Sequence, residues 1–111
     1  MKINNHEYGF LYTVGAHVEL QELQLSKPKN EADLIKLISI QAEILSRAYE
    51  EKKAFSDAKN KKKVLTRKEV MLLDYDLIWD LGKEINTAII KGTKRTVEAI
   101  SPKAQSKVQL P

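Results

Sequence analysis

The sequence predicts a single, mainly helical α+β domain in which an N-terminal β-hairpin packs on a bundle of three or four helices. The chain has 111 residues, which is enough for one compact domain. Its first residues alternate between polar and apolar side chains, and most of the remainder carries apolar residues at helical spacing. We expect residues 1–92 to form this domain and residues 93–111 to form a flexible, basic tail. Val97 and Ile100 are the last residues that could extend a helix, and disorder is expected from about Ser101 onward.

A hairpin is expected at the N-terminus. Lys2 and Ile3 form a short first strand, and a polar turn follows at residues 4–6, Asn4-Asn5-His6. The second strand is expected over residues 8–12, where every second residue is aromatic. Because a two-stranded hairpin alone is marginally stable in water, its aromatic face has to pack on the helices.

Two helices are expected next. Thr13 is placed to cap a helix over residues 14–25, and Asn30 to cap a longer one over residues 31–53. The apolar residues of the first are Val14, Val18, Leu20 and Leu23. The second carries an apolar stripe, interrupted by one glutamine, at Leu34, Ile38, Gln41, Leu45 and Ala48. Further apolar residues at 35, 37, 40 and 44 widen this stripe, so at least two elements have to cover it.

The second half of the chain predicts a connector and then helical structure. Residues 55–64 are polar and basic, which is typical of an exposed connector. Thr66-Arg67-Lys68-Glu69 is a capping box that starts a helix, and a second cap is available at residues 74–76. Either one helix follows, or a single turn and then a separate helix. Gly92 is expected to end the last helix.

The positive charge is confined to two segments. The formal net charge is +4, with a pI near 9.2. Residues 52–68 carry +7 and residues 93–111 carry +3, whereas residues 1–51 and 69–92 each carry −3. A nucleic-acid interface would use the basic side chains of the connector, Lys61, Lys62, Lys63, Arg67 and Lys68. No aromatic residues alternate with them and the body is acidic, which favours a solvated connector over a nucleic-acid interface. The alternative function is a small basic nucleic-acid-binding or regulatory protein that acts through this connector.

Nothing in the sequence predicts an enzyme or a cofactor. The chain has no cysteine, and His6 and His17 have no partners at metal-ligand spacing. Asp74, Asp76 and Asp80 resemble the start of a calcium-binding loop. Such a loop requires glycine at its sixth position and glutamate at its twelfth, where this chain has Trp79 and Ile85. No membrane-length apolar run or signal peptide is present, so we expect a soluble, intracellular protein.

Tyr75 and Trp79 lie four residues apart, on one side of the last helix, with Gly82 beside the indole. They either complete the core or anchor a partner, since tryptophan and tyrosine dominate interface hot spots. The candidate partner-binding surface combines this pair with the excess apolar face of the long helix, Ile35, Ile40 and Ile44. A homo-oligomer formed through the same surface is also expected to be feasible.

Three N-terminal segments resemble the opening of the tail assembly chaperones of long-tailed, siphovirus-type bacteriophages. They are residues 3–10 (INNHEYGF), 13–16 (TVGA) and 19–23 (ELQEL). The later order is similar too, with a long apolar helix, a polar connector, a helix start at residues 65–70 (LTRKEV) and a basic tail. The resemblance covers about the first 25 residues in detail and the remainder in layout.

The resemblance implies a non-enzymatic protein that binds the hydrophobic, largely helical tape-measure protein and keeps it soluble. It also implies that the protein helps tail-tube protein subunits to polymerise around that partner. Such a chaperone acts in the cytoplasm of the bacterial host and is absent from the mature virion. Families of this kind often make a second, longer product by translational frameshifting near the end of the short reading frame.

Overall fold

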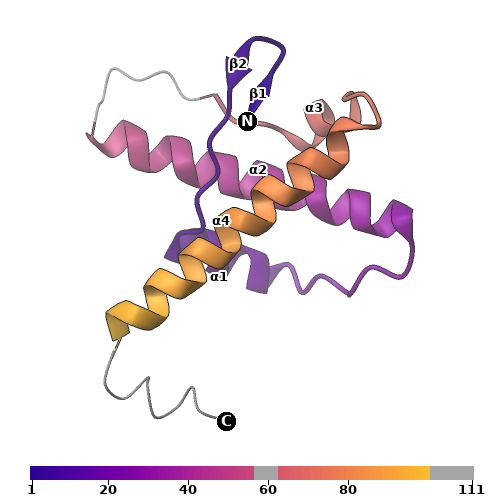
Figure 1. Cartoon of the computed structure of the whole chain (residues 1–111). Coiled ribbons are helices and arrows are strands. Elements are labelled where there is room, and N and C mark those ends of the chain that lie inside the picture. Colours follow the sequence, from indigo (N-terminus) through magenta and orange to yellow (C-terminus); the bar gives the residue numbers. More distant parts are fainter. Residues whose placement is uncertain (57–62, 101–111) are drawn as a thin grey trace.

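A computed structural model describes residues 1–56 and 63–100, with only the course of the helix for residues 94–100. Its elements are β1 (Lys2–Ile3), β2 (His6–Glu7), α1 (Val14–Glu22), α2 (Glu31–Ser56), α3 (Arg67–Met71) and α4 (Leu77–Ile100). The predicted fold class, a mainly helical chain with an N-terminal hairpin, is confirmed. The helix α4 crosses α2 at an angle, and α1 lies at one side of this crossing (Figure 1).

The hairpin is tighter than predicted. Lys2 pairs with Glu7 and Ile3 with His6, so His6 belongs to β2 and not to the turn. The turn consists of Asn4 and Asn5 alone, with φ of 50° and 65°. Positive φ at both central residues is typical of a two-residue type I′ turn, and asparagine tolerates it better than most residues.

The predicted strand over residues 8–12 is wrong, because β2 ends at Glu7. The alternating aromatic residues lie instead on an extended segment that crosses α2, where the Leu11 amide donates a hydrogen bond to the Leu45 carbonyl, at 3.1 Å. Tyr8 is buried, and Phe10 and Tyr12 pack at the edge of the core. Tyr8 still exchanges two hydrogen bonds with Met1, at 2.8 Å each. Beyond it, the period of two marks an extended chain that belongs to no described strand.

The helix α1 is capped as predicted, because the Thr13 hydroxyl accepts a hydrogen bond from the Ala16 amide at 3.1 Å. It ends at Glu22, three residues early, since Gln24 adopts φ of 49°, a left-handed conformation that no helix continues. Of the predicted apolar face, Leu20 packs against the core, but the other three residues do not: Val14 is 79% exposed, and Val18 and Leu23 are about half exposed. The helix packs on α2 mainly through Ala16 and Leu20.

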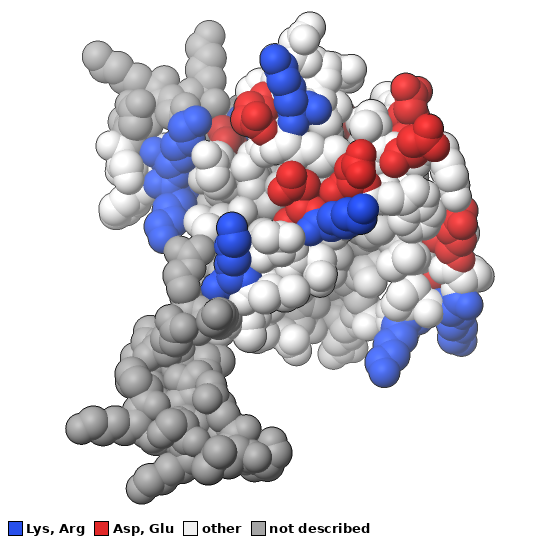
Figure 2. Space-filling view, viewed as in Figure 1, with Lys and Arg blue, Asp and Glu red and all other residues white. Residues whose placement is uncertain are grey.

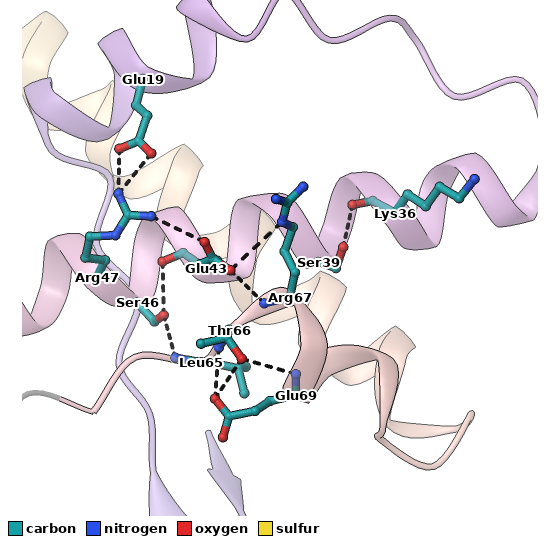
Figure 3. Close-up of polar contacts among 10 residues, drawn as sticks. All are labelled: Glu19, Lys36, Ser39, Glu43, Ser46, Arg47, Leu65, Thr66, Arg67 and Glu69. Carbon is teal, nitrogen blue, oxygen red and sulfur yellow. Dashed lines mark hydrogen bonds and ion pairs between the residues drawn. The ribbon is translucent and has the colours of Figure 1, made fainter.

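An ion pair adds a polar contact between α1 and α2. Nη1 of Arg47 donates to both carboxylate oxygens of Glu19, at 2.9 Å each, and this hydrogen bonding raises the pKa of Arg47 (Figure 3). Both side chains are partly exposed, so the pair stabilises the fold by about 1 kcal/mol at most. Glu19 therefore helps to hold α1 on α2.

The long helix α2 carries the centre of the core. Asn30 caps it as predicted, with its side-chain oxygen accepting from the Asp33 amide at 2.8 Å. From the predicted stripe, Ile38, Leu45 and Ala48 are buried. The buried apolar residues form one cluster, drawn from every part of the described chain: Ile3, Tyr8, Ala16, Ile38, Ala42, Ile44, Leu45, Ala48, Leu65, Val70, Ile78, Leu81 and Ile85.

Residues 63–67, which we call the strap, are held on α2 by a ladder of side-chain hydrogen bonds, and Figure 3 draws those to Ser46 and Glu43. Three residues spaced one turn apart on α2 accept the amides of alternate strap residues. The bonds are Lys63 to Glu50 Oε1 at 3.1 Å, Leu65 to Ser46 Oγ at 2.9 Å and Arg67 to Glu43 Oε1 at 2.8 Å. The part of the predicted exposed connector that the structure describes is thus attached to the helix, and the remainder, residues 57–62, lies outside the described residues.

Replacing Ser46 by alanine is expected to lower the free energy of unfolding by about 1–2 kcal/mol, because the buried Leu65 amide loses its acceptor. Ser39 is the matched control. Both serines are buried on α2 and donate to the carbonyl three residues earlier, but among the described contacts Ser39 accepts from no amide of another segment. Urea denaturation of Ser46→Ala and Ser39→Ala measures the difference. Equal losses would contradict the role of the ladder.

The capping box at the start of α3 is confirmed. Thr66 Oγ1 accepts from the Glu69 amide at 3.2 Å, and Glu69 Oε1 accepts from the Thr66 amide at 3.1 Å. This second bond is the main cause of the lowered pKa of Glu69. The helix ends after five residues, so of the two alternatives the single turn followed by a separate helix is the one formed.

The predicted helix stop at Gly92 is wrong, since α4 continues to Ile100. Gly92 is buried and has no positive φ. A Cβ atom at this position would lie 2.7 Å from Cβ and 2.8 Å from the carbonyl oxygen of Tyr12. The glycine therefore allows the segment before α1 to lie directly against α4. The first eight residues of the predicted tail belong to this helix, and residues 101–111 lie outside the described residues.

Candidate functional site

The candidate site is a groove of about 430 Å³ between α2 and α4. One wall comes from successive turns of the first half of α2: Leu34, Ile38 and Gln41. The other comes from α4: Trp79, Gly82, Lys83, Ile85, Asn86 and Ile89. The lining is mostly apolar, and it also contains the polar groups of Gln41, Lys83 and Asn86. This combination is typical of a site that binds another apolar group and fixes its orientation.

The groove exists because the crossing of α2 and α4 is close at Gly82. A Cβ atom on Gly82 would lie 3.2 Å from Cδ1 of Ile38, so a larger residue would press on α2. Without a side chain at Gly82, one side of the Trp79 indole stays uncovered by α4. Beyond the groove, Ile90 is 56% exposed on the same helix and continues the apolar surface.

The predicted partner-binding residues do not form one exposed apolar surface. Ile44 is 4% exposed and belongs to the core, so its assignment to an exposed face is wrong. Ile35 and Ile40 are partly buried and packed against the core. Ile40 lines a different depression, of about 200 Å³, together with Leu37 and with Leu25 from the chain between α1 and α2. The excess apolar face of α2 is thus covered largely by the protein itself.

Tyr75 and Trp79 do lie together, at the α4 end nearest the start of α2. Their rings meet edge to face, with centroids 5.9 Å apart and an interplanar angle of 87°. Trp79 packs against the core and lines the groove, whereas Tyr75 is 57% exposed. The Tyr75 hydroxyl donates to Glu31 Oε1 at 2.8 Å, and this hydrogen bond is the main cause of the raised pKa of Tyr75.

The groove residues Asn86 and Ile89 were not singled out from the sequence. The spacing of the last helix places them beside the buried residues Ile78 and Ile85, but it cannot tell which flank a neighbouring helix leaves open. A signal was present at Gly82, whose missing side chain beside the indole is visible in the sequence. Gln41, which interrupts the apolar stripe of α2, is the second signal, because it lies on the groove wall.

Ion pairs reduce the positive charge that the alternative nucleic-acid surface can present. Lys63 Nζ lies 3.8 Å from Glu69 Oε2, and Arg67 Nε lies 4.0 Å from Glu43 Oε1. Carboxylates this close offset the positive potential that a phosphate backbone requires. Lys68 is exposed on α3, and Lys61 and Lys62 lie outside the described residues.

The two histidines contact tyrosines. The His6 ring lies edge to face with Tyr8, at a centroid distance of 4.6 Å, and His17 Nδ1 is hydrogen bonded to the Tyr12 hydroxyl. Over residues 1–56 and 63–93, no three histidine, aspartate or glutamate side chains come close enough to hold a metal ion. No helix in this part of the chain has both the length and the apolar composition that crossing a membrane requires.

Comparisons of the sequence with known protein families and with curated proteins, and of the structure with solved structures, give no match. The candidate function therefore depends on the geometry of the groove and on the resemblance of the N-terminal segment.

Proposed function

We propose that the protein is a non-enzymatic tail assembly chaperone of a long-tailed bacteriophage, which binds an apolar helix of the tape-measure protein in the groove between α2 and α4. The observation that carries the proposal is the groove itself, with Trp79 in its wall and Gly82 at its base. An amphipathic helix laid into an apolar groove is a recurring mode of peptide recognition. The N-terminal resemblance names the partner.

The composition of the groove fits such a partner. Leu34, Ile38 and Ile89 present aliphatic side chains on both walls, and Trp79 presents an aromatic one. Large aromatic side chains at the centre of an interface carry a disproportionate share of its binding energy. Asn86 and Lys83 supply polar groups at the side, where they limit the orientations that a bound helix can take.

Co-expression with the tape-measure protein of the same phage tests this function. The wild-type chain is expected to keep the tape-measure protein in the soluble fraction and to co-purify with it. Asn86→Trp is expected to abolish both effects, because it fills the groove from an exposed position on its wall. Binding of the tape-measure protein to the wild-type chain is followed by the fluorescence of Trp79, since this is the only tryptophan of the chain.

Thr87→Trp is the matched control. Thr87 is also exposed, but it lines a separate depression on the hairpin side of α4, with Tyr8 and Phe10. This variant is expected to behave as the wild type does. If the wild-type chain neither binds nor solubilises the tape-measure protein, the function is wrong. If both tryptophan variants bind normally, the function stands and the groove is not its site.

The nucleotide sequence offers an independent test. We expect a slippery heptamer near the last codons of the gene, followed by an overlapping reading frame and a very long downstream gene for the tape-measure protein. An isolated gene without these neighbours would count against a role in tail assembly.

A further inference from the structure

A second surface lies at the turn between α3 and α4, outside the groove. We call residues 71–76 the tip. Three large apolar side chains of the tip are exposed: Met71 to 51%, Leu72 to 77% and Tyr75 to 57%. None of them lines the groove between α2 and α4. Single exposed apolar residues scattered over a surface are ordinary, but three in one short turn indicate a surface that contacts a partner.

The tip is held in one conformation by the described hydrogen bonds. The Leu72 amide donates to the Glu69 carbonyl and the Leu73 amide to the Val70 carbonyl, both at 3.1 Å. The Leu77 amide donates to the Asp74 carbonyl at 3.0 Å, which joins the tip to α4. Tyr75 is fixed from outside the turn by its bond to Glu31. The backbone that carries these side chains is therefore already in place, as is the Tyr75 side chain, so a partner need not order the turn on binding.

Acidic side chains predominate around the tip. Asp74 and Asp76 lie in it, and Tyr75 brings Glu31 to the same place. Glu69 is already paired with Lys63, and Lys68 lies on α3 three residues before Met71. The upper right of Figure 2, where Figure 1 places the turn between α3 and α4, is correspondingly red and white without blue. An apolar surface with acidic surroundings complements a partner that is both apolar and basic.

We propose that the tip is a docking site for a basic amphipathic helix of a partner protein, separate from the groove. The exposed side chains of Met71, Leu72 and Tyr75 take the apolar face of that helix, and its lysine or arginine side chains lie against Asp74, Asp76 and Glu31. Methionine adapts its shape to different partners, and tyrosine supplies area at a low cost in entropy. The site does not depend on the proposed chaperone function, since it shares no lining residue with the groove.

A fluorescent helical peptide of leucine and lysine, with about 18 residues and five turns, tests the docking site. Its counterpart carries glutamate in place of every lysine. Fluorescence anisotropy is expected to show binding of the lysine peptide, weakened when the salt rises from about 50 to about 200 mM, and none of the glutamate peptide. Leu72→Ser is expected to weaken binding by about fivefold or more. The double variant Asp74→Asn, Asp76→Asn is expected to reduce both the affinity and its dependence on salt.

Val14→Ser is the control, because Val14 is 79% exposed on α1, away from the tip. It is expected to leave the affinity unchanged, and circular dichroism confirms that each variant is folded. The proposal is overturned if the wild type does not bind at about 100 µM, if the glutamate peptide binds equally well, or if Val14→Ser weakens binding as much as Leu72→Ser. It is also overturned if light scattering shows a homodimer that Leu72→Ser dissociates, because a second copy then covers the tip.

Discussion

Leu65→Ala is expected to lower the free energy of unfolding by about 2–5 kcal/mol, the range for removing a fully buried leucine side chain. Leu65 is 1% exposed and lies in the strap, where its amide is bonded to Ser46 and its side chain joins the core. Domains of this size are stabilised by about 5–15 kcal/mol in total, so the loss is a large fraction. Urea denaturation followed by circular dichroism measures it.

The cavity is expected to be only partly refilled, because the strap cannot move inward freely. The amides of Lys63 and Arg67, on either side of Leu65, are bonded to α2. Leu72→Ala is the control, since Leu72 is also a leucine close to α3 but is 77% exposed, and its loss is expected to be within about 0.5 kcal/mol. A similarly small loss for Leu65→Ala would show that the strap is not part of the cooperative fold.

The strap shows why part of the fold could not be predicted from the sequence. Leu65 follows a run of polar and basic residues, and a single leucine there carries no periodicity. Its burial depends on Glu43, Ser46 and Glu50, which are far away along the chain and lie on the flank of the apolar face of α2. Local patterns indicate the helix and its caps, but not the segment that its polar side chains hold.

The caps were the most predictable features, because they depend on residues only three positions apart. Thr13, Asn30 and the box formed by Thr66 and Glu69 all make the expected bonds. The face of a short helix was less predictable. The valines of α1 are largely exposed, because a small alanine and the pair between Glu19 and Arg47 set its contact with α2.

The candidate site illustrates the same limit. The sequence indicates that the apolar surface of α2 is too broad for one neighbour, and the structure covers it with α1, α4 and the chain between α1 and α2. Ile44 is buried as a result, while Trp79 stays beside a groove. Which part of a broad apolar face remains open depends on helix crossings, and these depend on small residues such as Gly82 and Gly92.

Gly92→Ala is expected to lower the free energy of unfolding by about 1–3 kcal/mol, although alanine favours a helix by about 1 kcal/mol over glycine. The added Cβ would lie 2.8 Å from the Tyr12 carbonyl oxygen, a backbone atom that no side-chain rotation can move away. The surrounding segment is itself held in place. The Leu11 amide is bonded to the Leu45 carbonyl at 3.1 Å, and the Tyr12 hydroxyl is bonded to His17.

The two other helical glycines provide controls, because each leaves a different amount of free space for an added Cβ atom. A Cβ on Gly15 would meet only Thr13 Oγ1, at 3.8 Å, so Gly15→Ala is expected to stabilise the protein by up to about 1 kcal/mol. A Cβ on Gly82 would lie 3.2 Å from Cδ1 of Ile38, the flexible end of that side chain. For Gly82→Ala, the gain in helix propensity and the steric strain are therefore expected to offset each other nearly completely. If Gly92→Ala also stabilised the protein in thermal and urea denaturation, the close contact between α4 and Tyr12 would be wrong. The alanine variants are therefore expected to fall in stability in the order Gly15→Ala, Gly82→Ala, Gly92→Ala. This order tests the packing of α4 against the segment that leads into α1.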